Sequence, residues 1–155
     1  MSDTPPTGPT RIDKTAVDAL QDALAAEHAA VWSYTLIPAF LPADQVAAAR
    51  SDADAHRALR GQLEQTLSDV GVQPVSAQPA YQTPEPVVDG PSAAALAVVA
   101  ETDTLAAWRS VVERTRDRAL RQAALDALTQ GTLRCAVWRT VVNDQPTILT
   151  FPGHA

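Results

Sequence analysis

Apolar side chains recur at alternating intervals of three and four residues in four separate stretches of this 155-residue chain. That spacing places them on one face of an α-helix and is typical of helices that pack together in a bundle. Gly71 is well placed to end the second helix, and Ser92 and Asp117 are candidate N-caps of the third and fourth. The sequence therefore predicts an all-α fold of four helices. The four stretches cover residues 13–37, 43–70, 92–112 and 117–142.

The connection between the second and third stretches is long and rich in proline. Residues 71–91 contain five prolines, a density that excludes a regular helix or a central strand. An extended segment of this length can run from one end of the bundle to the other, so that the second and third helices point the same way. One long crossover between two short connections is the topology of a ferritin-like four-helix bundle.

The chain is expected to form one domain with a tail at each end. Residues 1–11 contain four Pro or Gly residues and no apolar periodicity, which is typical of a flexible tail. Residues 12–155 are long enough for a single hydrophobic core and too short for two. The C-terminal tail, residues 143–155, contains Ile148, Leu149 and Phe151, so we expect it to fold back against the bundle.

Composition excludes several classes of protein. A formal net charge of −6 argues against a nucleic-acid surface, which needs a clustered basic face. The single cysteine excludes an intrachain disulfide and any site built from several cysteines. No apolar run approaches the ~20 residues that span a bilayer, and the first residues lack the basic and apolar regions of a secretory signal. We therefore expect a cytoplasmic protein without nucleic-acid or membrane partners.

Three ionisable residues interrupt the apolar helix faces. Glu27, His56 and Glu101 each occupy a position where the pattern of its helix calls for an apolar side chain. Each lies near the middle of its helix, and the expected topology brings the middles of these helices to one level. Because burying such groups without partners costs several kcal/mol each, something must compensate them. We expect the three to meet inside the bundle, together with a metal ion or with arginines.

A metal ion is one candidate partner. The di-iron site of a ferritin-like bundle takes one glutamate from each of two helices and a Glu-x-x-His pair from each of the other two. The chain supplies Glu27, Glu101 and His56, with Asp52 one turn before the histidine as an auxiliary ligand, but the fourth helix contains no histidine. The residues thus allow at most a single-metal site with three or four ligands, suited to iron or manganese.

Arginine side chains are the other candidate partners. Arg60 lies one turn beyond the histidine, and Arg121 and Arg139 lie on or near the apolar face of the fourth helix. Guanidinium groups can satisfy buried carboxylates without any metal, and such clusters can fix the register of packed helices. Tyr34 follows Glu27 on the same face, so we expect its hydroxyl to bond a nearby carboxylate. In a metal site, Tyr34 and Arg60 would instead support the ligands.

Five short segments of the sequence together resemble an actinobacterial ferritin-like domain family of unknown function. The resemblance covers residues 13 to about 153. It implies the helical bundle and points to the two core glutamates and the histidine as residues of interest, but it implies neither iron storage nor any particular reaction. The segments are Leu20 to Tyr34, His56 to Arg60, Pro79 to Tyr81, Ala100 to Glu101 and Trp138 to Arg139.

Three classes of function stay open at this point. The favoured one is a non-catalytic structural or interaction module that associates with further copies of itself. The alternative is an oxidoreductase-like protein with one iron or manganese ion at the Glu/His/Glu site. The third is a small-ligand binder in the bundle core, with Arg60 contacting an anion. The sequence contains no glycine-rich phosphate loop, nucleophile elbow or His-Glu-x-x-His motif, so no catalytic residue can be assigned.

Overall fold

The computed structural model describes residues 12–154, and in this range the chain forms four long helices and no strand. The all-helical fold predicted from the sequence is confirmed, while the expectation of a flexible tail over residues 1–11 lies outside the described residues. Within residues 12–154, no helix combines the length and the apolar character needed to cross a membrane. The helices are α1 (Lys14–Leu36), α2 (Ala43–Asp69), α3 (Gly90–Arg114) and α4 (Arg118–Val141), with a 3-10 turn, η1 (Ile37–Ala39), after α1.

The helix ends follow local capping chemistry. Gly71 follows α2 with a φ of 76°, a backbone conformation that a residue without a Cβ adopts most readily. Asp117 caps α4, its carboxylate accepting a hydrogen bond from the backbone N–H of Leu120 at 2.7 Å. The N-cap of α3 is Asp89 rather than Ser92. The cap lies three residues earlier than expected because the first turn of the helix tolerates proline.

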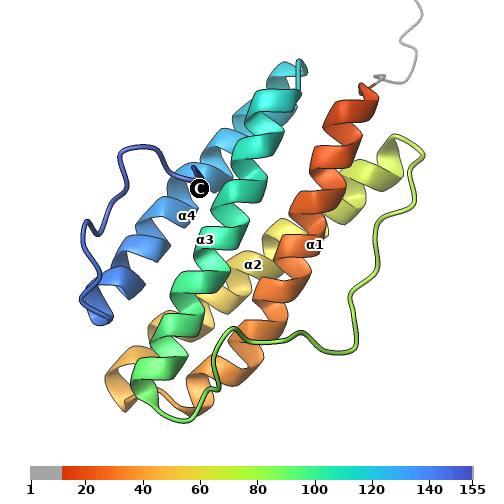
Figure 1. The fold of residues 1–155 in the computed structure, drawn as a ribbon. Helices are drawn as coiled ribbons and strands as arrows, with labels where there is room; N and C mark the ends of the chain where they lie inside the picture. The colour runs from red at the N-terminus through yellow and green to blue at the C-terminus, as the bar shows by residue number, and fades with distance from the viewer. Residues whose placement is uncertain (1–11, 155) are drawn as a thin grey trace, which may run out of the picture.

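The helices pack as two antiparallel pairs that are joined through α1 and α3. α1 packs against both α2 and α3, and α3 packs against α4. Figure 1 shows that α2 and α3 run in the same direction, opposite to α1 and α4. α2 and α4 form no comparably close pair, which leaves space between these two helices on one side of the bundle.

The segment between α2 and α3 runs along α1 from one end of the bundle to the other (Figure 1). The side-chain amide of Gln21 donates a hydrogen bond to the carbonyl of Gln73 at 2.7 Å and accepts one from the N–H of Val75 at 2.8 Å. Further along, the ring of Tyr81 packs on Trp32 with ring centroids 5.8 Å apart. These contacts explain how a segment without secondary structure is held on the bundle.

The apolar core consists of two clusters, one in each half of the bundle. Leu20, Leu24 and Trp108 belong to the first, and Ile37 and Trp138 belong to the second. Burial of each large aliphatic side chain contributes roughly 1.5–3 kcal/mol. Between these clusters, α1, α2 and α3 each contribute one ionisable side chain that is fully buried. The apolar clusters therefore enclose a polar centre.

The segment that follows α4 folds back on the outside of α3 and α4 (Figure 1). The guanidinium of Arg139 donates to the carbonyl of Pro146 at 2.9 Å, and that of Arg109 donates to the carbonyl of Pro152 at 3.5 Å. Gly153 approaches α3 so closely that a Cβ would lie 2.5 Å from the carbonyl oxygen of Leu105. Only glycine fits there without a shift of the backbone.

Candidate functional site

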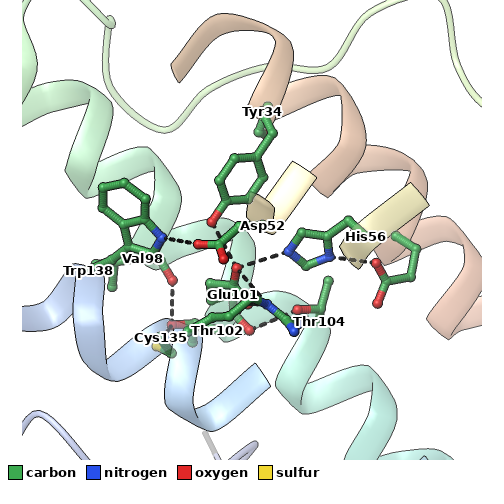
Figure 2. A network of polar contacts seen from close by, with 12 residues as sticks. Tyr34, Asp52, His56, Val98, Glu101, Thr102, Thr104, Cys135 and Trp138 are labelled. Carbon is green, nitrogen blue, oxygen red and sulfur yellow. Dashed lines mark hydrogen bonds and ion pairs between the residues drawn. The ribbon is translucent and has the colours of Figure 1, made fainter. Parts of the chain in front are cut away.

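Glu27, His56 and Glu101 meet at the centre of the bundle, where all three are fully buried. The imidazole of His56 lies between the two carboxylates: Nδ1 is 2.7 Å from Oε2 of Glu27, and Nε2 is 2.9 Å from Oε1 of Glu101. Figure 2 shows the ring of His56 beside Glu101. α1, α2 and α3 each supply one of the three side chains, so the cluster ties three helices together at one level.

The carboxylates hold His56 in its charged form. Burial alone would lower the pKa of this imidazole, but the hydrogen bonds to Glu101 and Glu27 outweigh it and raise the pKa to about 9. A histidine donates from both ring nitrogens only when it is protonated. Burial also acts to raise the pKa of Glu101, yet the neighbouring His56 and Arg134 outweigh this effect and hold that pKa below its usual range.

Glu101 accepts most of the hydrogen bonds in the cluster. The hydroxyl of Tyr34 donates to its Oε1 at 2.8 Å, as Figure 2 shows. Nε of Arg134 is shared between Oε1, at 3.3 Å, and Oε2, at 3.2 Å. Burial and the charge of Glu101 raise the pKa of Tyr34 far above its usual range, so the phenol stays neutral and acts as a donor.

Two tryptophans complete the network at its edges. Nε1 of Trp108 donates to Oε1 of Glu27 at 2.7 Å, and Nε1 of Trp138 donates to Oδ2 of Asp52 at 2.8 Å (Figure 2). Burial raises the pKa of Asp52, although the bond from Trp138 acts in the opposite direction. Among the described residues no hydrogen bond joins Asp52 to His56, so Asp52 borders the cluster without entering it.

The arginine that pairs with the cluster is not one of the three expected. Arg121 is exposed, and Arg139 pairs with Asp144 at 3.0 Å instead. Arg60 is half-buried and bonds no member of the cluster among the residues described. Arg134 takes this position because it starts beside the apolar face of α4 and its long side chain reaches inward.

A sequence signal for Arg134 does exist. Gly131, on the apolar face of α4, lies one turn earlier, and a Cβ added to it would be 3.4 Å from Nη2 of Arg134. The missing side chain leaves the space in which the guanidinium lies. A glycine on a buried helix face, one turn before an arginine, is therefore a pattern that could have identified this residue.

The donor atoms of the cluster do not suit a single metal ion. One ion requires ligand atoms that face a common point, whereas Glu27 and Glu101 lie against opposite nitrogens of the His56 ring. Within residues 12–154, no group of three His, Cys, Asp or Glu side chains is arranged to hold a metal. The residues expected as ligands instead form a chain of hydrogen bonds, and Arg134 contributes a positive charge beside it.

Comparison with known proteins places this architecture in a family. A family model described as "Domain of unknown function (DUF4439)" matches residues 19–155. A crystal structure of a conserved hypothetical protein, rv2844, from Mycobacterium tuberculosis is 35% identical in sequence, with a TM-score of 0.80. The match covers 83% of this chain and 98% of that chain. No curated protein matches the sequence. The chain therefore belongs to the family of the domain of unknown function DUF4439.

Proposed function

We propose that this protein is a non-catalytic, ferritin-like helical module whose buried polar cluster is a metal-free structural element. The observation that supports this role is the position of His56, which is bonded through both ring nitrogens to Glu27 and Glu101. In di-iron bundles of this type, glutamates and histidines direct their donor atoms at metals. In this chain, residues of the same kind bond one another.

The charges of the cluster balance internally. Glu27 and Glu101 supply two negative charges, and protonated His56 and Arg134 supply two positive charges. Each group also lies on a different helix, so the pairing requires α1, α2, α3 and α4 to have one relative register. Buried ionic groups are known to specify register in some helical proteins. This is the structural role that we assign to the cluster.

Metal analysis tests the proposal directly. Untagged protein, grown with added iron and manganese and then desalted, is expected to contain far less than one equivalent of either metal by elemental mass spectrometry. Glu27→Gln, which removes one carboxylate, is expected to give the same low values. Stoichiometric iron or manganese in the wild-type protein, lost in a folded Glu27→Gln variant, would establish the single-metal alternative in place of this proposal.

Self-association is the second part of the proposed role. Leu133, Val137 and Val141 lie at four-residue intervals on α4, and their exposed fractions are 53%, 53% and 40%. Residues at this spacing share one helix face, and exposed apolar patches often mark contact surfaces. The three side chains therefore support association with a second copy of the chain.

Light scattering across a range of concentrations measures this association. We expect a dimer mass for the wild-type protein and a monomer mass for the double variant Leu133→Glu, Val137→Glu. Leu125→Glu is the matched control, because Leu125 is exposed on the same helix but lies about 80° around it from Leu133 and about 120° from Val137, on the side away from Val141. A monomer mass for the wild-type protein at every concentration would contradict self-association.

A further inference from the structure

A groove separates α2 from α4 on the side of the bundle where these helices are not closely packed. It consists of two adjoining hollows of about 560 and 420 Å³, which share Gln62 and Ala123. These volumes lie in the range of known ligand pockets. Small residues on both helices create the space, because larger side chains at the same positions would fill it. They are Ala55, Ala58 and Gly61 on α2, and Ala123 and Ala127 on α4.

The lining of the groove changes along its length. The larger hollow has an apolar floor to which Leu63, Trp108 and Leu120 contribute. The smaller one contains the only charged residues of the lining, Asp126 and Arg134. From Leu120 to Arg134 the groove follows α4 for about 21 Å, at 1.5 Å per residue. One end is thus charged and the other is apolar.

Arg134 offers unused hydrogen-bond donors at the charged end. Its side chain is 14% exposed, and only Nε donates hydrogen bonds to Glu101. Among the described residues, no protein group accepts a hydrogen bond from its terminal nitrogens. In the part of the chain that the structure describes, Nδ1 of His28 is the one side-chain nitrogen or oxygen that is both fully buried and without a partner. The terminal nitrogens of Arg134 also lack a partner, so they are not fully buried and solvent can reach them. A guanidinium presented in this way suits an acceptor from outside the protein.

We propose that this groove binds an amphipathic monocarboxylate, with the carboxylate on the terminal nitrogens of Arg134 and the alkyl chain on the apolar floor. The outer edge of a guanidinium matches the two oxygens of a carboxylate. The alkyl chain gains from burial against Leu63 and Trp108. Asp126 lies in the same hollow, and its carboxylate accepts a hydrogen bond from Gln122 at 2.8 Å. Its negative charge repels a dianion more strongly than a monocarboxylate. This inference goes beyond the proposed structural role and does not depend on the metal content of the cluster.

Calorimetric titration with decanoate tests the proposal. Decyltrimethylammonium is the matched probe, because it also has a linear chain of ten carbons and carries the opposite charge. We expect decanoate to bind saturably with one site per chain, and the cation to bind at least about tenfold weaker, which corresponds to 1.4 kcal/mol. Absence of saturable decanoate binding, or equal affinity for both probes, would overturn the proposal.

Variants that fill the groove locate the binding. Ala123→Trp occupies the point that both hollows share, and Ala58→Trp acts from the opposite wall, so a folding defect in one leaves the other as a test. Both substitutions are expected to abolish decanoate binding while helix content by circular dichroism is unchanged. Ala47→Trp is the control, since Ala47 is exposed on α2 about 16 Å from Ala58 and lines neither hollow. Unchanged binding in both folded groove variants, or equal loss in the control, would overturn the assignment.

Discussion

At the scale of single residues, the stability of the core depends on the proton carried by His56. The imidazole is fully buried and contacts a carboxylate at each ring nitrogen. If the ring lost its proton, one nitrogen would become an acceptor facing a carboxylate oxygen, and the centre would keep two negative charges against one positive charge. Such an arrangement is unfavourable in a buried site, where charges are weakly screened.

The free energy of unfolding should therefore fall in mildly alkaline solution. The pKa of His56 is about 9 in the folded chain against an ordinary 6.5, so the folded state binds this proton more tightly than the unfolded state does. The resulting stabilisation is fully present below pH 6.5 and is lost as the pH rises through 9. A shift of this size corresponds to roughly 3 kcal/mol. Urea unfolding at a series of pH values measures the decline.

His56→Gln is the control for this pH dependence, because glutamine does not titrate. The variant should be less stable than the wild-type protein at neutral pH, and its stability should change much less across the same interval. A decline of equal size in both proteins would show that other groups, such as the thiol of Cys135, cause it.

Removal of one carboxylate should destabilise the fold strongly. Glu27→Ala leaves both His56 and the indole N–H of Trp108 without their acceptor. Breaking a buried ion pair in this way typically costs about 3–5 kcal/mol. Urea unfolding is the measurement, and Glu113→Ala is the matched control. Glu113 is exposed and pairs with Arg109 at the surface, where such pairs contribute less than about 1 kcal/mol. Similar losses in the two variants would contradict the assigned role of the cluster.

At the scale of the helices, the start of α3 is the best-defined helix end. The carboxylate of Asp89 accepts from the N–H of Ser92 at 2.9 Å, and the hydroxyl of Ser92 accepts from the N–H of Asp89 at 3.0 Å. This reciprocal capping box satisfies backbone donors that a helix leaves free. It also fixes the point at which the long connection along α1 enters α3.

Asp89→Ala should reduce the free energy of unfolding by about 1 kcal/mol, the usual effect of losing an N-cap. Asp13→Ala is a matched control, because Asp13 is the N-cap residue of α1 but its side chain makes no capping hydrogen bond. We expect a smaller change for the control in urea unfolding. Equal changes would mean that the capping bonds of Asp89 contribute nothing specific.

The helices were easier to predict from the sequence than the partners of the buried residues. Helix spans follow from a periodicity that many residues share, so a misplaced cap such as Ser92 moves one boundary by only three residues. The meeting of Glu27 and Glu101 follows from their positions on apolar faces. Arg134 could not be placed in the same way, because a long side chain at the edge of a face can point inward or outward. Its direction depends on the space beside Gly131. The glycine signals that space in the sequence, but only the folded chain shows that the guanidinium occupies it.

At the scale of the whole molecule, α2 and α4 are linked by polar bonds across a gap. α1 joins α2 to α3, and α3 joins α4, through close packing. Between α2 and α4, the hydrogen bond from Trp138 to Asp52 is a direct link, as Figure 2 shows. An indirect link runs from His56 through Glu101 to Arg134. These bonds hold the helices at a separation that leaves the groove between them open.

Trp138→Phe should therefore loosen α2 relative to α4 without removing the aromatic ring from the core. The substitution deletes the N–H that donates to the half-buried carboxylate of Asp52, and an acceptor left in this way costs about 1–3 kcal/mol. Trp32→Phe is the matched control, because Trp32 is half-buried, packs on Tyr81, and donates no side-chain hydrogen bond within the described residues.

Urea unfolding should show the loss for Trp138→Phe alone, and amide hydrogen exchange should quicken in α2 and α4 more than in α1. If both variants exchange at the wild-type rate in α2 and α4, the direct bond does not hold these helices together, and the separation of α2 from α4 depends on His56, Glu101 and Arg134.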